Sequence, residues 1–287
     1  MASVLLGKTG IRVEKNGFGA LPIQRITQEE AVRLLHQAFD GGIRYFDTAR
    51  SYTDSEKKLG AAFGGGKRAE LFLATKTPSH TAEGFWKDLE TSLRLLRTDY
   101  IDVYQFHNPP FCPKPGDGSG LYEAMLEAKK QGKIRYIALT NHRLAVAREA
   151  VESGLYDLLQ FPFSYLADPK DEELVRLCAE NNVGFVAMKA LSGGLITNSA
   201  AAYAYLAQYE NVLPIWGVQW ESELREFLSY VSNPPVLTPE LSAVIAHDRQ
   251  ELAGNFCRGC GYCLPCPAGI DIPTAARMSL LLRRSPT

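Results

Sequence analysis

The sequence predicts a closed (β/α)8 barrel that is followed by a helical, cysteine-rich extension. Eight short apolar runs alternate with amphipathic stretches between residues 16 and 233, as expected for a parallel sheet covered by helices. The chain of 287 residues is long enough for one such barrel of roughly 250 residues and a small appendage. Eight strand–helix units favour closure into a barrel over an open, doubly wound sheet.

The predicted strands are apolar along most of their length, which is typical of parallel strands buried on both faces. They cover Asn16–Ile23, Arg44–Ala49, Leu71–Lys76, Ile101–His107, Ile134–Asn141, Leu158–Tyr165, Gly184–Ala190 and Val212–Val218. Apolar residues between them recur at helical spacing, for example at Ala31, Leu35 and Ala38. We therefore expect an amphipathic helix after each strand.

Both ends of the chain carry additions to the barrel. The opening segment Val4–Val13 predicts a hairpin that closes the bottom of the barrel, and Pro239–Leu252 predicts an extra helix. We divide the chain into a barrel at residues 1–235 and a C-terminal helix with a ferredoxin-like cysteine segment at residues 236–287. The second part is too short to hold a core of its own without a metal.

Composition excludes several classes of function. Hydrophobic residues make up 46% and charged residues 22% of the chain, with a net charge of −1, as in an ordinary globular protein. This charge gives no indication of a nucleic-acid or membrane partner. The N-terminus has no signal-peptide pattern and no run is long enough to span a bilayer, so we expect a cytoplasmic protein.

Four polar residues lie at the ends of three consecutive predicted strands. Asp47, Lys76 and His107 lie near the ends of the second, third and fourth strands, and Tyr52 follows Asp47 by five residues. In a (β/α)8 barrel these positions meet at the carboxyl-end face, where active sites are built. A single charged strand end is usually a solvated cap, but four such residues together indicate a catalytic site.

These side chains suit proton transfer to a carbonyl oxygen. The ordinary pKa of tyrosine, about 10, is too high for efficient donation at neutral pH, whereas a nearby ammonium favours the phenolate. We therefore expect Tyr52 to be the general acid and Lys76 to modulate its pKa. Asp47 would hold Lys76, and His107 would orient the substrate carbonyl. Such donation is useful when a hydride reaches the carbonyl carbon, which requires a nicotinamide.

The segments that carry these residues resemble a known family. Gly41–Gly60, GGIRYFDTARSYTDSEKKLG, resembles the aldo-keto reductase signature around the catalytic aspartate and tyrosine. The segments LFLATK and IDVYQFHNP resemble the family's lysine and histidine segments, in the same order. The resemblance covers residues 1 to about 230. It implies an oxidoreductase that transfers a hydride between NAD(P)H and a small carbonyl compound or alcohol.

The resemblance also implies residues that hold the nicotinamide. GKIRYIALTN resembles the strand whose terminal Ser-Asn pair binds the carboxamide, with Thr140 in place of serine and Asn141 beside it. Gln160 corresponds to a glutamine that contacts the same amide. Met188 occupies the position of a tyrosine that stacks on the nicotinamide, and a methionine sulfur can still cover a ring. Two further contacts are expected in the same segment, at Lys189 and Leu191.

The expected phosphate site departs from the family pattern after the eighth strand. The basic positions that grip the 2′-phosphate of NADPH correspond to Gly217, Val218 and Glu223. A carboxylate repels a phosphate, so the sequence favours NADH somewhat over NADPH. A Glu223 that merely faces solvent, weakly bound NADPH and an electron supply other than a nicotinamide are the alternatives.

Four cysteines near the C-terminus form the pattern C-x-x-C-x-x-C-x-x-C-Pro: Cys257, Cys260, Cys263 and Cys266. Such a run is typical of bacterial ferredoxins, where three cysteines hold one [4Fe–4S] cluster and the fourth binds another. Zinc is the alternative, although zinc sites usually separate their cysteine pairs more widely. The pattern, with the ARMSLLLRR stretch after it, resembles an iron–sulfur branch of the aldo-keto reductases that continues into a second cysteine set. Either Cys266 completes the first cluster, or the sequence is a piece of a longer chain.

The main hypothesis is therefore a carbonyl or alcohol oxidoreductase with an accessory iron–sulfur cluster. One alternative is an electron-transfer module in which the barrel docks a redox partner protein or another redox cofactor. A second alternative is a regulatory barrel that senses a nucleotide. Four apolar side chains either line a substrate pocket or belong to the ordinary packing of the core, with equal weight: Leu21, Ile23, Phe111 and Trp216.

Overall fold

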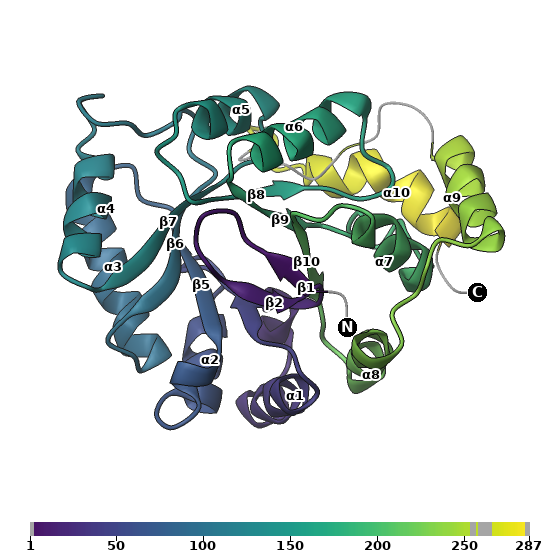
Figure 1. Ribbon diagram of the computed structural model, residues 1–287, viewed down its shortest axis with the longest axis horizontal. Coiled ribbons are helices and arrows are strands. Elements are labelled where there is room, and N and C mark those ends of the chain that lie inside the picture. The colour runs from purple at the N-terminus through teal and green to yellow at the C-terminus, as the bar shows by residue number, and fades with distance from the viewer. Residues whose placement is uncertain (1–2, 253–256, 258–265, 285–287) are drawn as a thin grey trace.

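A computed structural model describes residues 3–252, 257 and 266–284. Eight parallel strands form a closed barrel in sequential order, in which the last strand pairs with the first (Figure 1). The strands are β3 (Gly17–Gly19), β4 (Tyr45–Asp47), β5 (Phe72–Thr77), β6 (Ile101–His107), β7 (Ile134–Thr140), β8 (Leu158–Pro162), β9 (Gly184–Met188) and β10 (Val212–Gly217). Each falls within or within one residue of a predicted strand, and the predicted fold class is confirmed.

Eight helices cover the outside of the barrel, one after each strand (Figure 1). They are α1 (Gln28–Asp40), α2 (Ser55–Phe63), α3 (Ala82–Leu96), α4 (Leu121–Lys130), α5 (Leu144–Glu152), α6 (Pro169–Glu180), α7 (Ser199–Ala207) and α8 (Glu221–Ser232). Short 3-10 helices lie at Pro22–Arg25 and Arg68–Glu70. Local sequence sets several helix starts. At α1 the Thr27 hydroxyl accepts from the Glu30 amide while the Glu30 carboxylate accepts from the Thr27 amide, which satisfies two otherwise unpaired donors.

The interior of the barrel is closed at its amino end by the predicted hairpin. Strands β1 (Ser3–Leu5) and β2 (Arg12–Glu14) pair antiparallel, and the hairpin lies across the ring of strands in Figure 1. Its apolar residues pack on inward-facing strand residues such as Tyr45 and Leu213. The turn requires glycine at position 7, because φ is +52° and a Cβ there would lie 2.4 Å from the Asn182 carbonyl oxygen. The carboxyl end is thereby left as the open end of the barrel.

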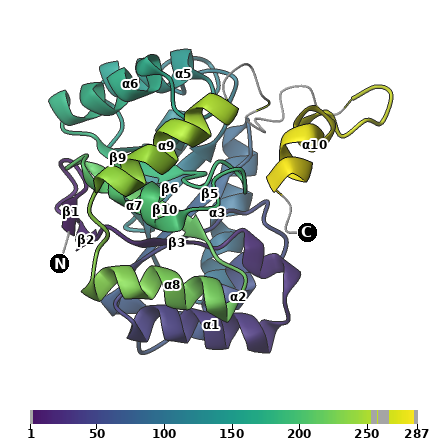
Figure 2. The same cartoon turned by 90° about the vertical axis from the view of Figure 1, so that its right-hand side faces the viewer.

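Among the described residues after the barrel, two segments are helical, α9 (Pro239–Glu251) and α10 (Ile272–Arg284). The extra helix predicted at Pro239–Leu252 is confirmed. In α9, Asp248 accepts a hydrogen bond from the Tyr165 hydroxyl, and Arg249 Nε donates to the Tyr165 carbonyl oxygen at 2.7 Å. In α10, Arg277 Nη2 donates to the carbonyl oxygens of Ser192 and Gly193, each at 2.9 Å. Helix α10 thus contacts the loop after β9, and Figure 2 shows it at the end of the barrel opposite the hairpin.

Among the described residues, no helix combines the length and the apolar character that crossing a membrane would require.

Candidate active site

The four residues expected to be catalytic lie together at the carboxyl end of the barrel. Asp47 ends β4, Lys76 is the penultimate residue of β5, and His107 ends β6. Tyr52 lies in the loop between β4 and α2. Lys76 Nζ lies 2.6 Å from Asp47 Oδ2 and 5.2 Å from the centre of the Tyr52 ring. The Tyr52 ring meets the His107 ring edge-on at 5.9 Å. The structure therefore brings all four side chains into one cluster.

Asp47 and Lys76 form a buried ion pair beneath this cluster. Their side chains are 3% and 1% exposed. Lys76 also donates to the Thr48 carbonyl oxygen at 2.5 Å, while Asp47 accepts from the side-chain amides of Gln105 at 3.1 Å and Gln160 at 3.4 Å. Burial raises the pKa of Asp47, and Lys76 with the amide donors opposes this rise. In this arrangement the Asp47 carboxylate can hold the Lys76 ammonium in place.

Tyr52 differs from expectation in the net direction of its pKa. Burial raises the pKa of Tyr52 above its ordinary value, and the charge of Lys76 lowers it by less. Lys76 thus acts in the direction expected of a modulator, but the cost of burying a phenolate outweighs its effect. Tyr52 therefore carries its proton in the free protein, which is the state that a general acid requires.

His107 is held as a neutral imidazole. Burial, together with the nearby Lys76 and His142, lowers its pKa to about 3. His107 Nδ1 lies 3.2 Å from the Ser51 hydroxyl oxygen, and which of the two atoms donates depends on the imidazole tautomer. A neutral His107 can donate one hydrogen bond to a substrate without adding a positive charge.

A buried carboxylate fixes the loop that carries Tyr52. Glu56, in the first turn of α2, forms an ion pair with Arg50. It also accepts hydrogen bonds from the hydroxyls of Thr75 and Ser92, each at 2.7 Å. The backbone amide of Arg50 donates to the Lys76 carbonyl oxygen at 3.0 Å. The loop is thereby tied to β5 and α3 on either side of Tyr52.

Sequence reasoning missed three polar residues of this site, Ser51, Glu56 and Gln105. A signal was available for Gln105, because it lies two residues before His107 on a strand and therefore points to the same side. For Ser51 and Glu56 the sequence carries no comparable signal, since their contacts depend on how the loop folds over β5.

Of the residues expected to hold a nicotinamide amide, one has a side-chain atom free for a ligand and another is fully engaged within the protein. Thr140 and Gln160 are adjacent across β7 and β8, and both are buried. The Gln160 side-chain oxygen is buried without a hydrogen-bond partner among the described residues, so it could accept from an amide of a ligand. Asn141 is fully buried. Its side-chain oxygen accepts from the amides of His142 and Arg143, and its nitrogen donates to the Pro109 carbonyl. Asn141 therefore shapes the loop after β7.

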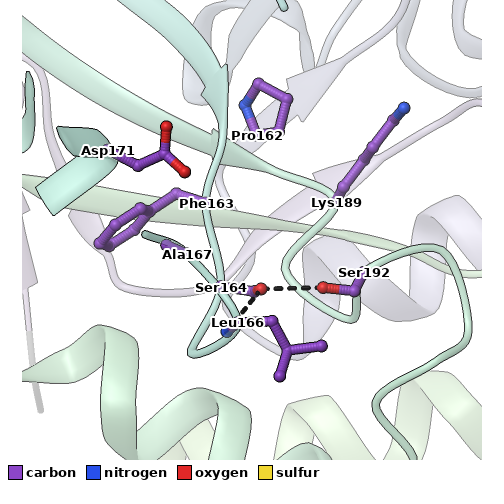
Figure 3. Close-up of a pocket in the computed structure, with 8 residues that line it drawn as sticks. All are labelled: Pro162, Phe163, Ser164, Leu166, Ala167, Asp171, Lys189 and Ser192. Carbon is purple, nitrogen blue, oxygen red and sulfur yellow. Dashed lines mark hydrogen bonds between the residues drawn. The ribbon is translucent and has the colours of Figure 1, made fainter. Parts of the chain in front are cut away.

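The segment after β9 lies beside a small cavity of about 40 Å³. Its lining, drawn in Figure 3, consists of Pro162, Phe163, Ser164, Leu166, Ala167, Asp171, Lys189 and Ser192. The Ser164 and Ser192 hydroxyls are joined at 2.8 Å, and the Lys189 side chain extends away from this pair. Met188 precedes the cavity, and its sulfur lies 3.9 Å from Thr140 Oγ1. Leu191 packs against the core.

At the region expected to meet a 2′-phosphate, Glu223 has a structural role that the sequence did not predict. Gly217 is exposed at the end of β10, whereas Val218 is buried. The Glu223 carboxylate accepts from the backbone amides of Gln219 at 2.8 Å and Trp220 at 2.9 Å. It therefore caps the start of α8 and does not merely face solvent. A carboxylate already occupies the helix N-terminus that would otherwise attract an anion.

For two of the four candidate pocket walls the structure favours the alternative of ordinary packing. Ile23 and Trp216 are buried in the core, and the Trp216 ring stacks on Phe227 at 4.5 Å. Leu21 and Phe111 are 41% and 36% exposed, so they remain accessible to a substrate. Strand-end position alone does not distinguish a core side chain from a pocket wall.

The cysteine motif lies largely outside the described residues. Cys260 and Cys263 are among those not described, whereas Cys257 and Cys266 are half-buried. Within residues 3–252, 257 and 266–284, no group of three or more His, Cys, Asp or Glu side chains is arranged to hold a metal ion.

Comparisons with known proteins agree with this architecture. L-galactose dehydrogenase from Arabidopsis thaliana is 30% identical over 210 residues, which are 67% of this chain and 66% of that protein. An aldo-keto reductase from Bacillus halodurans, solved in its holo form, has a TM-score of 0.75 and 22% identity, over 86% of this chain and 96% of that chain. One from Klebsiella pneumoniae, in complex with NADPH, has a TM-score of 0.72 and 21% identity, over 85% of this chain and 94% of that chain.

The family model of the aldo/keto reductase family matches residues 15–202. This match covers more than half of the chain and contains the four clustered residues at the carboxyl end of the barrel. The chain therefore belongs to the aldo/keto reductase family of oxidoreductases.

Proposed function

We propose that the protein reduces a carbonyl compound, or oxidises the corresponding alcohol, with Tyr52 as the general acid or base. The observation that carries this proposal is the cluster of Tyr52, Lys76 and His107 over the buried Asp47. When bound, a nicotinamide supplies or accepts the hydride at the substrate carbon. The protein's own residues handle the proton and the charge on the substrate oxygen.

In the reducing direction, Tyr52 donates its proton to the substrate oxygen as negative charge develops there. Lys76 stabilises the tyrosinate that remains, and Asp47 keeps the ammonium in position. His107 donates a hydrogen bond to the same oxygen, which polarises the carbonyl. In the oxidising direction the tyrosinate takes the proton back.

The described residues fit a nicotinamide at this face. The unpartnered Gln160 oxygen would accept from the carboxamide, and the neighbouring Thr140 would contribute its hydroxyl. Met188 would cover the ring, and Lys189 and Leu191 would contact the rest of the nucleotide with Gly217. Glu223 supports a preference for NADH, because the family resemblance puts a basic residue for the 2′-phosphate of NADPH at this position, and a carboxylate repels a phosphate.

The substrate class that we favour is a small polyhydroxylated aldehyde or its lactol. L-galactose dehydrogenase is the name of the relative that is 30% identical, and the site offers hydrogen-bonding groups beside two exposed apolar side chains, Leu21 and Phe111. A redox partner protein is not required for this reaction.

The first experiment compares wild type with Tyr52→Phe in NADH and NADPH oxidation against a panel of aldehydes and aldoses. We expect the variant to lose at least about a thousandfold in kcat, with nucleotide affinity nearly unchanged. Tyr100→Phe is the matched control, since Tyr100 lies before β6 at the opposite end of that strand. Retained turnover in Tyr52→Phe would remove Tyr52 as the acid.

A second function, electron transfer through an iron–sulfur cluster, is favoured by the cysteine pattern. We propose that Cys257, Cys260, Cys263 and Cys266 bind a [4Fe–4S] cluster. Arg277, downstream of Cys266, contacts the loop after β9, so helix α10 lies near the active-site face. Purification without oxygen, with iron and sulfide analysis, should give about four irons per chain. A colourless protein that contains zinc would refute the cluster and leave a structural clip.

A further inference from the structure

His107 requires a defined tautomer to act on a carbonyl. A neutral imidazole carries one proton, on either Nδ1 or Nε2, and its other nitrogen can only accept. A carbonyl oxygen has no hydrogen to give, so the imidazole nitrogen that faces it must be the protonated one. Which nitrogen is protonated is set by the hydrogen bond that the other nitrogen makes.

The partner of Nδ1 is the Ser51 hydroxyl, at 3.2 Å. Ser51 immediately precedes Tyr52, and its loop is held down by the Arg50–Glu56 ion pair. The position of this hydroxyl is therefore fixed by the same contacts that fix Tyr52. A hydroxyl can donate, whereas a backbone carbonyl or a carboxylate at this position could only accept and would hold the proton on Nδ1.

The charged and titratable groups around His107 agree with a neutral ring. Lys76 on β5 is a cation and His142 after β7 has a pKa lowered to about 3. Tyr52 keeps its proton, and the Asp47 carboxylate is occupied by Lys76 and two amides. None of these described groups is a carboxylate hydrogen-bonded to His107 that would stabilise an imidazolium.

We propose that Ser51 is a positioning residue whose hydroxyl donates to His107 Nδ1 and thereby keeps the imidazole proton on Nε2, available to the substrate oxygen. This inference rests on the proposed carbonyl chemistry. It predicts that position 51 controls the hydrogen-bonding role of His107 and acts on the reaction through His107.

The test replaces Ser51 with residues of different hydrogen-bonding capacity. Ser51→Thr keeps the donor, Ser51→Ala removes it, and Ser51→Asp replaces it with an acceptor. Thr53→Ala is the matched control, because this neighbouring exposed hydroxyl bonds to Gln24 instead. Each variant is labelled with 15N at histidine, and the two ring nitrogens of His107 are identified by the signals that disappear in His107→Gln.

We expect wild type, Ser51→Thr and Thr53→Ala to carry the proton on Nε2. In Ser51→Ala the 15N signals of His107 should move toward those of a mixture of tautomers. The kcat/KM of this variant should fall about three- to tenfold, the equivalent of one hydrogen bond. Its nucleotide affinity should be unchanged. In Ser51→Asp the proton should move to Nδ1, and the pH–rate profile should gain a new protonation near neutral pH.

A wild-type proton on Nδ1, or a Ser51→Ala variant with an unaltered spectrum, would overturn the proposal. The spectra are recorded without turnover, so they separate this inference from the proposed function. If no carbonyl compound is reduced by wild type but the ring is protonated on Nε2 and responds to position 51, the proposed reaction fails and the role of Ser51 stands.

Discussion

The buried Asp47–Lys76 ion pair makes a prediction about stability that does not depend on turnover. In Asp47→Asn the ammonium of Lys76, 1% exposed, loses its counter-charge and keeps only the Thr48 carbonyl and a neutral amide. Removing one partner of a buried pair costs about 3–5 kcal/mol. Unfolding of a 287-residue chain involves an entropy of about 0.6 kcal/mol/K. We therefore expect Tm to fall by about 5–8 °C.

The double variant Asp47→Asn, Lys76→Met is expected to recover most or all of this loss. Burial raises the pKa of Asp47. A carboxyl whose pKa is higher in the folded protein than in the unfolded chain stabilises the fold below its unfolded pKa. That contribution is lost as pH rises through the folded pKa, so ionising Asp47 in the folded protein costs stability. Removing both charges eliminates this cost together with that of burying Lys76.

Thermal and urea unfolding of wild type, both single variants and the double variant at neutral pH gives the four free energies required. All three variants should lack activity, so stability is read separately from function. The reasoning is refuted if Asp47→Asn lies within about 1 kcal/mol of wild type. It is also refuted if the double variant is no more stable than the weaker single variant.

Three further predictions concern residues around the site. Glu56→Gln removes the charge that holds Arg50, and we expect urea unfolding to show a loss of about 1–3 kcal/mol in unfolding free energy. Steady-state kinetics should show a lower kcat with little change in nucleotide affinity. Gln160→Leu removes the unpartnered oxygen, so the Kd for NADH should rise about tenfold in a fluorescence titration; an unchanged Kd would place the carboxamide elsewhere. Arg277→Ala removes both bonds from α10 to the loop after β9, and cleavage near residue 272 in limited proteolysis should accelerate relative to the control Met278→Ala.

The strands of this barrel were predictable because each one is a short run of mostly apolar residues in the sequence. A run such as Ile101–His107 is apolar on both faces apart from a few polar positions, and only a parallel strand covered by helices requires that pattern. The catalytic cluster followed from one topological rule, that carboxyl ends of parallel strands meet on one face. Neither the strand positions nor the clustering of the polar strand ends depends on how individual side chains pack.

Properties that depend on packing could not be predicted in the same way. The net pKa direction of Tyr52 depends on how deeply the ring is buried, which no spacing encodes. Trp216 lies at a strand end like a pocket wall, yet it turns onto Phe227 in the layer between β10 and α8. Glu223 lacked a recognisable cap signal, because the residue that begins α8 is preceded by Trp220 and not by serine, threonine or asparagine.

The loop between β4 and α2 concentrates the polar functions of the site into a few residues. In the proposed reaction Tyr52 supplies the proton, the preceding Ser51 contacts His107, and Arg50 and Glu56 anchor the loop on either side. A proton donor on a mobile loop would lose its alignment with the substrate oxygen, and misplacement by about 1 Å costs roughly a hundredfold in rate. The energetic cost of burying Glu56 and Asp47 is therefore explained by function. Each buried carboxylate holds a cation: Asp47 holds Lys76 beside the Tyr52 ring, and Glu56 holds Arg50 two residues before Tyr52.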